Sequence, residues 1–214
     1  MDFMKIIKSL EQLLYELMVW LVFYPLTLVR SIVHPLRLMD YADEELGDAD
    51  EDRYSDTLSP PIFLAITLAL VHLVELGSQL NVVTEGTLAD DRNLIAFRLV
   101  AFALFPLMMS LRMLRATKTP LDRKTLRPPF YAQCFAAAPF ALGIDVATLI
   151  LATGRGAAGF SMMGAVCLWY LAVQTLWFRE QLAIGWARAL GNALRGFLFA
   201  LLLVAILASV VDLL

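Results

Sequence analysis

Long apolar runs are the main feature of the sequence. A membrane-crossing helix needs about 20 mostly apolar residues, because about 30 Å of hydrocarbon is crossed at about 1.5 Å per residue. Five runs qualify: Pro61 to Gln79, Asn93 to Leu114, Phe130 to Ala152, Gly156 to Phe178, and Gly196 to Leu214. The pattern therefore predicts an all-α transmembrane helix bundle of five spans, occupying residues 60–214.

The amino-terminal region has a different pattern. Between Phe3 and Met18, apolar residues recur three and four positions apart, with charged and amide side chains opposite, which predicts an amphipathic helix. It continues into Leu17 to Val29, an apolar stretch that is short for a span and is broken by Pro25. We expect residues 1–39 to form an interfacial or re-entrant helical region. A crossing there is the alternative, and it would leave two lysines outside.

An acidic stretch separates these two regions. Nine acidic residues lie between Asp40 and Asp56, and Arg53 is the one basic residue among them. Such a run normally stays solvated and unfolded, so residues 40–59 are expected to be a disordered linker. It is also a candidate docking strip for a basic partner.

Basic residues gather in the loop between the second and third spans. That loop carries Arg112, Arg115, Lys118, Arg123, Lys124 and Arg127, with Asp122 as its single acid. Short loops rich in lysine and arginine stay in the cytoplasm. Five spans then leave the amino terminus inside and the carboxyl terminus outside, in a multi-pass protein of the plasma or inner membrane.

Composition supports this assignment. Hydrophobic residues make up 60% of the chain and charged residues 17%, against about 45 to 50% and about 25% in soluble domains. A soluble fold of 214 residues would expose large apolar patches, so the lipid bilayer is the expected surrounding. The net charge of -3 gives no support for nucleic-acid binding.

Two short patterns resemble binding motifs but lack the context these motifs need. Residues 154–159 match G-x-G-x-x-G, yet the dinucleotide fingerprint requires a parallel βαβ sheet and a later acid, so a tight turn with close helix packing is preferred. Asp48, Asp50 and Asp52 have calcium-loop spacing, but a required glycine is replaced by Arg53. With no catalytic motif in the chain, we expect no enzyme activity, cofactor or metal.

Four ionisable residues lie inside the predicted spans: His72 and Glu75 in the first, Arg98 in the second and Asp145 in the third. A charge at mid-membrane costs about 2.5 to 3.5 kcal/mol on insertion scales, so it usually finds a partner. At about 1.5 Å per residue, all four lie roughly 6 to 10 Å below the outer ends of their spans. We therefore expect one cluster, in which Arg98 pairs with Glu75 or Asp145.

His72 lies three residues before Glu75, on the same helix face, and is expected to complete the hydrogen-bond network of this cluster. Two interpretations stay open. The cluster is either a structural clamp that joins the first three spans or a relay for protons or ions.

A helix-packing feature is predicted near the inner surface of the membrane. Residues Arg179 to Arg195 have the pattern of an amphipathic helix between the fourth and fifth spans. Gly185, Ala189 and Ala193 form a small-residue stripe along it. Small residues let helices approach closely, so this stripe is expected to pack against another helix.

Several short segments resemble the Yip family of five-span, Rab-interacting membrane proteins and its bacterial branch of permease-like members. These segments are Ser59-Pro60-Pro61-Ile62-Phe63, Phe130-Tyr131-Ala132, Trp169-Tyr170-Leu171 and Ala183-Ile184-Gly185-Trp186-Ala187-Arg188-Ala189-Leu190. The resemblance covers Ser59 to Leu214 and implies a polar cytoplasmic amino-terminal part followed by five spans. The Asp-Leu-Tyr-Gly-Pro element of eukaryotic members is missing, so Rab binding is not implied.

Together these features predict a non-enzymatic membrane protein that organises or supports other membrane components. Its expected partners are other membrane protein subunits or further copies of itself. The alternative is a small permease or channel that uses the intramembrane cluster to pass protons, ions or solutes.

Overall fold

The computed structural model describes residues 3–46, 54, 57–78 and 86–212, and helices make up most of these ranges. The helices are α1 (Phe3–Val33), α2 (Pro35–Glu45), α3 (Pro60–Ser78), α4 (Asp91–Thr117), α5 (Arg123–Ala152), α6 (Gly156–Leu182) and α7 (Trp186–Asp212), with a short 3-10 helix, η1 (Thr87–Ala89), before α4. The described residues contain no strand. The predicted all-α class is confirmed.

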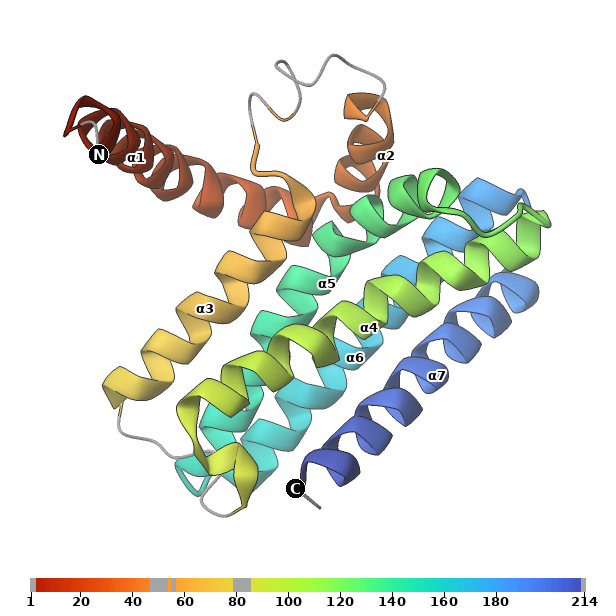
Figure 1. Cartoon of the computed structure of the whole chain (residues 1–214). Helices are drawn as coiled ribbons and strands as arrows, with labels where there is room; N and C mark the ends of the chain where they lie inside the picture. The colour runs from red at the N-terminus through yellow and green to blue at the C-terminus, as the bar shows by residue number, and fades with distance from the viewer. Residues whose placement is uncertain (1–2, 47–53, 55–56, 79–85, 213–214) are drawn as a thin grey trace.

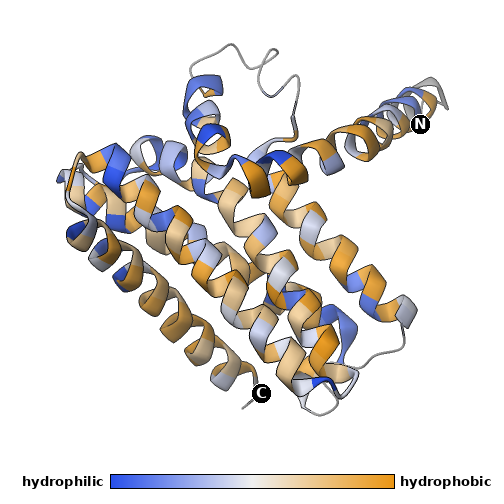
Figure 2. Cartoon of the chain, turned by 180° about the vertical axis from the view of Figure 1, so that it is seen from behind, coloured by the Kyte–Doolittle hydropathy of each residue, from blue (hydrophilic) through white to orange (hydrophobic). Residues whose placement is uncertain are grey.

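Helices α3 to α7 form a bundle in which neighbours in sequence run in opposite directions (Figure 1). α5 lies at its centre and packs against α3, α4 and α6, while α7 packs against α4 and α6. Hydrophobic residues run along the bundle helices (Figure 2), and many of them, such as Leu73, Leu168 and Leu198, are exposed. Six helices, α1 and α3 to α7, are long and apolar enough to cross a membrane.

α1 is one continuous helix, so the predicted break at Pro25 is wrong. A proline inside a helix leaves the carbonyl four residues earlier without its partner. That residue is Leu21, which lies on the exposed side of α1, where the missing bond disturbs no packed neighbour. α1 therefore passes through Pro25 and ends at Val33.

α1 lies across one end of the bundle at a steep angle to α3 to α7 (Figure 1). Its residues from Ile7 to Met18 are exposed. Packing begins further along, where Thr27 and Ser31 are fully buried and α1 contacts α5 and α2. The first half of α1 thus presents its leucines to the surroundings of the bundle.

The predicted disordered linker is wrong for residues 40–45, which form the second half of α2. Leu38, Met39 and Ala42 are buried on one face of α2, which packs against α5. Apolar positions interleaved with the acids therefore order this part of the acidic stretch. Residues 47–53 and 55–56, including the calcium-like aspartates, lie outside the described part of the chain.

The predicted amphipathic helix over residues 179–195 is also wrong, because a turn divides it. α6 ends at Leu182, Ala183 takes the left-handed conformation with φ 49°, and α7 begins at Trp186. The guanidinium of Arg179 lies 4.2 Å from the centre of the Trp186 ring across this turn. The last bundle helix therefore starts at Trp186 instead of Gly196.

α5 also starts earlier than predicted, because a capping box defines its first turn. The Asp122 carboxylate accepts hydrogen bonds from the backbone N–H groups of Lys124 (2.7 Å) and Thr125 (2.8 Å). The Thr125 hydroxyl accepts one in return from the backbone N–H of Asp122. The hydrogen bond from Thr125 is the main reason that the pKa of Asp122 is lowered.

Candidate functional site

The four ionisable residues predicted to cluster are all buried, on three neighbouring helices. His72 and Glu75 are 7% exposed and lie one turn apart on α3, Arg98 on α4 is 6% exposed, and Asp145 on α5 is 4% exposed. We call these four residues the charged cluster. Its members come from distant parts of the sequence, so it depends on how α3, α4 and α5 pack.

Arg98 is the hub of the charged cluster. Its Nη1 atom lies 2.6 Å from Glu75 Oε2, and its Nε atom lies 3.8 Å from Asp145 Oδ1. The predicted pairing is present and involves both carboxylates. A single guanidinium on α4 thus attracts carboxylates on α3 and α5.

Some polar atoms of the charged cluster have no hydrogen-bond partner. Within the described residues, four buried atoms of the cluster make no hydrogen bond: His72 Nδ1, Asp145 Oδ2, and the two atoms Glu75 Oε2 and Arg98 Nη1, which meet as an ion pair. The expected completion of the network by His72 is therefore not seen at its Nδ1 atom. Of these atoms, His72 Nδ1 and Asp145 Oδ2 have neither a hydrogen bond nor an ion-pair contact with a described residue.

An apolar crevice lies beside the charged cluster, between α4, α5, α6 and α7. Its volume is about 410 Å³, and Arg98, Asp145 and Thr148 are its lining residues with charged or hydroxyl side chains. The rest of its wall is formed mostly by aliphatic and aromatic side chains, such as Leu94, Phe102 and Val204. Apolar chains therefore fit this space better than a file of water or ions does.

Four aromatic rings pack together beside this crevice, and three of them, Phe105, Phe140 and Phe197, line it. Phe140 stacks on Tyr170 with ring centres 4.4 Å apart, and Phe105 meets Phe140 edge to face at 5.0 Å. Phe197 of α7 lies within 6.1 Å of all three rings. We call these four residues the aromatic core. It fills the space where α4, α5, α6 and α7 meet.

The structure contains a second buried polar contact between bundle helices, which the sequence pattern did not predict. Gln133 on α5 and Gln174 on α6 are fully buried and exchange two hydrogen bonds, of 2.8 and 2.6 Å between amide nitrogen and amide oxygen. The available signal was a lone glutamine in each of two apolar spans. Such residues usually pair with each other or with backbone.

The predicted small-residue stripe is present only in part. Ala189 and Ala193 on α7 are fully buried. Gly185 does not take part: it is exposed in the α6–α7 turn, with open space around the position of a Cβ atom. The close approach continues instead at Gly196, where a Cβ atom would lie 2.6 Å from Met109 Sδ of α4.

The glycines of the G-x-G-x-x-G segment serve a turn and a close packing contact. Gly154 has φ 79° in the α5–α6 turn, a conformation that favours glycine. A Cβ atom at Gly159 would lie 2.5 Å from Leu151 Cγ of α5. Both observations agree with the predicted tight turn and close helix packing.

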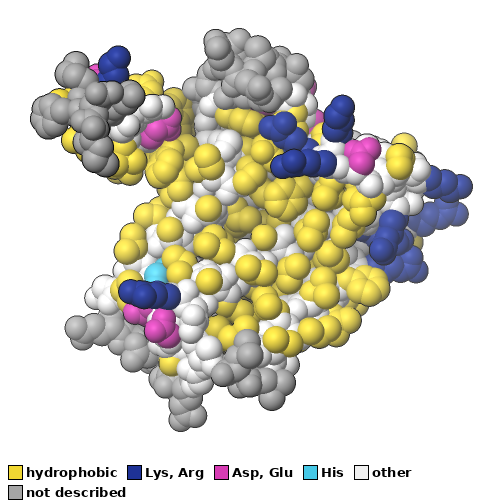
Figure 3. Space-filling view, viewed as in Figure 1, with side chains coloured by type: hydrophobic (Ala, Val, Ile, Leu, Met, Phe, Trp, Pro, Cys, Tyr) yellow, Lys and Arg dark blue, Asp and Glu magenta, His cyan; other side chains and the backbone are white. Residues whose placement is uncertain are grey.

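Lysines and arginines, all but Arg112 exposed, gather at one end of the bundle (Figure 3). This basic end is formed by the last turns of α4 and α6 and the first turns of α5 and α7. Its members are Arg112, Arg115, Lys118, Arg123, Lys124, Arg127, Arg179, Arg188 and Arg195. Asp122 and Glu180 are the acids of these turns, and Asp40 of α2 lies beside them, accepting a 3.2 Å hydrogen bond from Gln181 of α6. The charged cluster lies toward the opposite end.

No family model, curated protein or solved structure matches the chain. The resemblance to the Yip family therefore stays a prediction from short motifs. Two of these motifs lie inside α5 and α6, and one spans the turn before α7.

Proposed function

We propose that this protein crosses the membrane five times, through α3 to α7, and acts as a non-enzymatic organising or accessory subunit of a membrane assembly. The observation that carries the proposal is the pairing of Arg98 with carboxylates of two other helices. A buried, paired charge of this kind joins helices, and the aromatic core fills the bundle beside it. Such an arrangement favours a clamp over an open path.

The orientation of α1 supports five crossings instead of six. α1 is long enough to span, but it lies across the bundle end and exposes apolar and charged residues together over its first half. A helix with these properties is suited to the plane of the membrane interface. We therefore assign α1 to the interface, with the amino terminus on the same side as the basic end.

The charge distribution supports a cytoplasmic location for the basic end. Short loops rich in lysine and arginine remain in the cytoplasm, and the α4–α5 connection is such a loop. With α7 running away from this end, the carboxyl terminus lies outside. Reporter fusions at the two termini test the topology: opposite sides are expected, and two termini on one side would refute five crossings.

The subunit role predicts an assembly larger than the 23.9 kDa chain. Native mass spectrometry of the full-length protein, extracted gently from its own membrane, measures this mass directly. We expect a complex with other membrane proteins or with further copies. A particle of one chain alone, recovered under several mild detergents, would contradict the role.

The alternative function, a small permease or channel, is favoured by one specific observation. Arg98 and Asp145 line the 410 Å³ crevice, and Asp145 Oδ2 has no hydrogen-bond partner in the described part of the chain. Purified protein in vesicles with an imposed proton gradient tests it. Flux that disappears in Asp145→Asn but persists in the control Gln133→Asn would support transport over the subunit role.

A further inference from the structure

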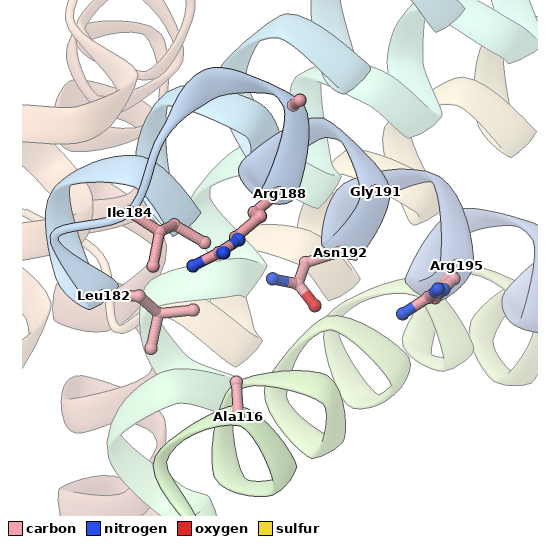
Figure 4. A pocket seen from close by; sticks show the side chains of 8 residues that line it. Ala116, Leu182, Ile184, Arg188, Gly191, Asn192 and Arg195 are labelled. Atoms are coloured by element: carbon pink, nitrogen blue, oxygen red, sulfur yellow. The ribbon is translucent and has the colours of Figure 1, made fainter.

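A pocket of about 560 Å³ opens at the basic end, between the last turns of α4 and α6 and the start of α7 (Figure 4). Arg188, Asn192 and Arg195 line one side of it. Their spacing of four and three residues places them on one face of α7. The small residues Ala116 and Gly191 leave the space between the helices unfilled.

The polar groups of this pocket are arranged to donate hydrogen bonds to an anion. Neither Arg188 nor Arg195 forms an ion pair with a described residue, and no acidic residue lines the pocket. Asn192 is buried, and its Oδ1 atom accepts a 2.8 Å hydrogen bond from Arg112 Nε of α4. Because the oxygen is engaged, the amide NH₂ group is the end of Asn192 left for an acceptor.

The rest of the pocket indicates that this anion is attached to an apolar body. Leu182 and Ile184 form a wall close to Arg188 (Figure 4). The neighbouring Trp186 is 56% exposed, as aromatic residues at the membrane interface commonly are. Basic pockets at the ends of membrane helices suit the head groups of anionic lipids.

We propose that this pocket binds the phosphate of an anionic phospholipid in the leaflet at the basic end. Arg188 and Arg195 attract the phosphate, Asn192 donates a hydrogen bond to it, and the wall of Leu182 and Ile184 contacts the glycerol and upper acyl region. This inference rests on the membrane-spanning role proposed above. It adds a specific lipid ligand to that role.

The test uses full-length protein that resists alkaline carbonate extraction, so a failure of membrane insertion is recognised separately. The protein is delipidated in detergent and titrated with phosphatidylglycerol or phosphatidylcholine, and bound lipid is counted by native mass spectrometry. Preferential retention of phosphatidylglycerol is expected. The double variant Arg188→Gln/Arg195→Gln should bind it roughly 30-fold more weakly, since each basic residue near an anionic lipid contributes about fivefold.

A steric variant separates the pocket from its charge. A Cβ atom at Gly191 meets nothing within 4 Å, so Gly191→Leu fills the pocket while both arginines remain. It should lose lipid retention without losing thermal stability, because leucine favours the helix more than glycine does.

The matched charge control is Arg123→Gln/Lys124→Gln, which removes two charges from the same end outside the pocket. This control should retain the lipid. The proposal would be overturned by equal retention of the two lipids, by equal loss in the control, or by retention in Gly191→Leu. Displacement of the lipid by millimolar inorganic phosphate would instead identify a site for a free anion, and would also overturn it.

Discussion

Removing the charge of Arg98 should destabilise the bundle more than removing either carboxylate. The guanidinium lies between Glu75 and Asp145, and all three side chains are almost fully buried. Arg98→Gln leaves two buried carboxylates without a cation. Glu75→Gln or Asp145→Asn leaves one carboxylate paired with Arg98, so the cluster keeps a neutral ion pair.

The distances set the order of the effects. Breaking a buried ion pair by removing one partner costs about 3 to 5 kcal/mol, which is the range expected for Arg98→Gln. Coulomb attraction falls with distance, so the 2.6 Å contact to Glu75 is about one and a half times stronger than the 3.8 Å contact to Asp145. Glu75→Gln should therefore cost less than Arg98→Gln but more than Asp145→Asn, because it removes the closer of the two ion-pair contacts.

The assay is reversible unfolding of the purified protein in mixed micelles, followed by fluorescence of the four tryptophans. Surface variant Arg155→Gln, at the same end of the bundle but exposed, is the control for a general effect of charge removal. A stability loss in the order Arg98→Gln, Glu75→Gln, Asp145→Asn is expected. The clamp would be refuted if Arg98→Gln were as stable as the wild type, or if Asp145→Asn lost more stability than Glu75→Gln.

Three further predictions concern packing and capping. Gln133→Leu strands the amide of Gln174 and should cost about 1 to 3 kcal/mol, whereas the double leucine variant should recover most of that loss in the same unfolding assay. Gly143→Ala places a Cβ atom 2.6 Å from Val166 Cγ2, so it should cost about 1 to 3 kcal/mol and be rescued by Val166→Ala; full stability of the single variant would contradict the close contact. The pKa of Asp122 is lowered in the folded state, so its cap is intact above about pH 4 and is lost as the pH falls through that lowered value. Hydrogen-exchange protection of the first turn of α5, corrected for intrinsic rates, should fall on acidification in the wild type and be low at every pH in Asp122→Ala.

Local pattern was a good guide where apolar runs were long. The cores of α3, α4, α5 and α6 coincide with predicted spans, because a run of about 20 apolar residues has few alternatives to a membrane helix. Boundaries were less predictable. The start of α5 depends on the Asp122 cap, and the end of α6 depends on Ala183 adopting a left-handed conformation, which composition does not encode.

The polar contacts also divide into those that the sequence predicted and those that depend on helix packing. The positions of Glu75, Arg98 and Asp145 inside apolar spans predict that these residues have partners, because an unpaired charge in hydrocarbon is costly. Gln133 and Gln174 carry no charge, and their pairing across 41 residues of sequence emerged only from the packing of α5 on α6. The same packing decided that Gly196 and Ala193 approach a neighbour while Gly185 does not.

The sequence by itself determined that this chain is helical, has several membrane-length helices and holds buried charges, since each of these follows from the nature and spacing of residues along one segment. The tertiary structure decided which helices meet, that α1 lies across the bundle end, that α2 orders half of the acidic stretch, and that Arg188, Asn192 and Arg195 face a pocket. These features depend on contacts between segments far apart in the chain. A local pattern predicts that a side chain needs a partner, but the packing of the helices determines which residue that partner is.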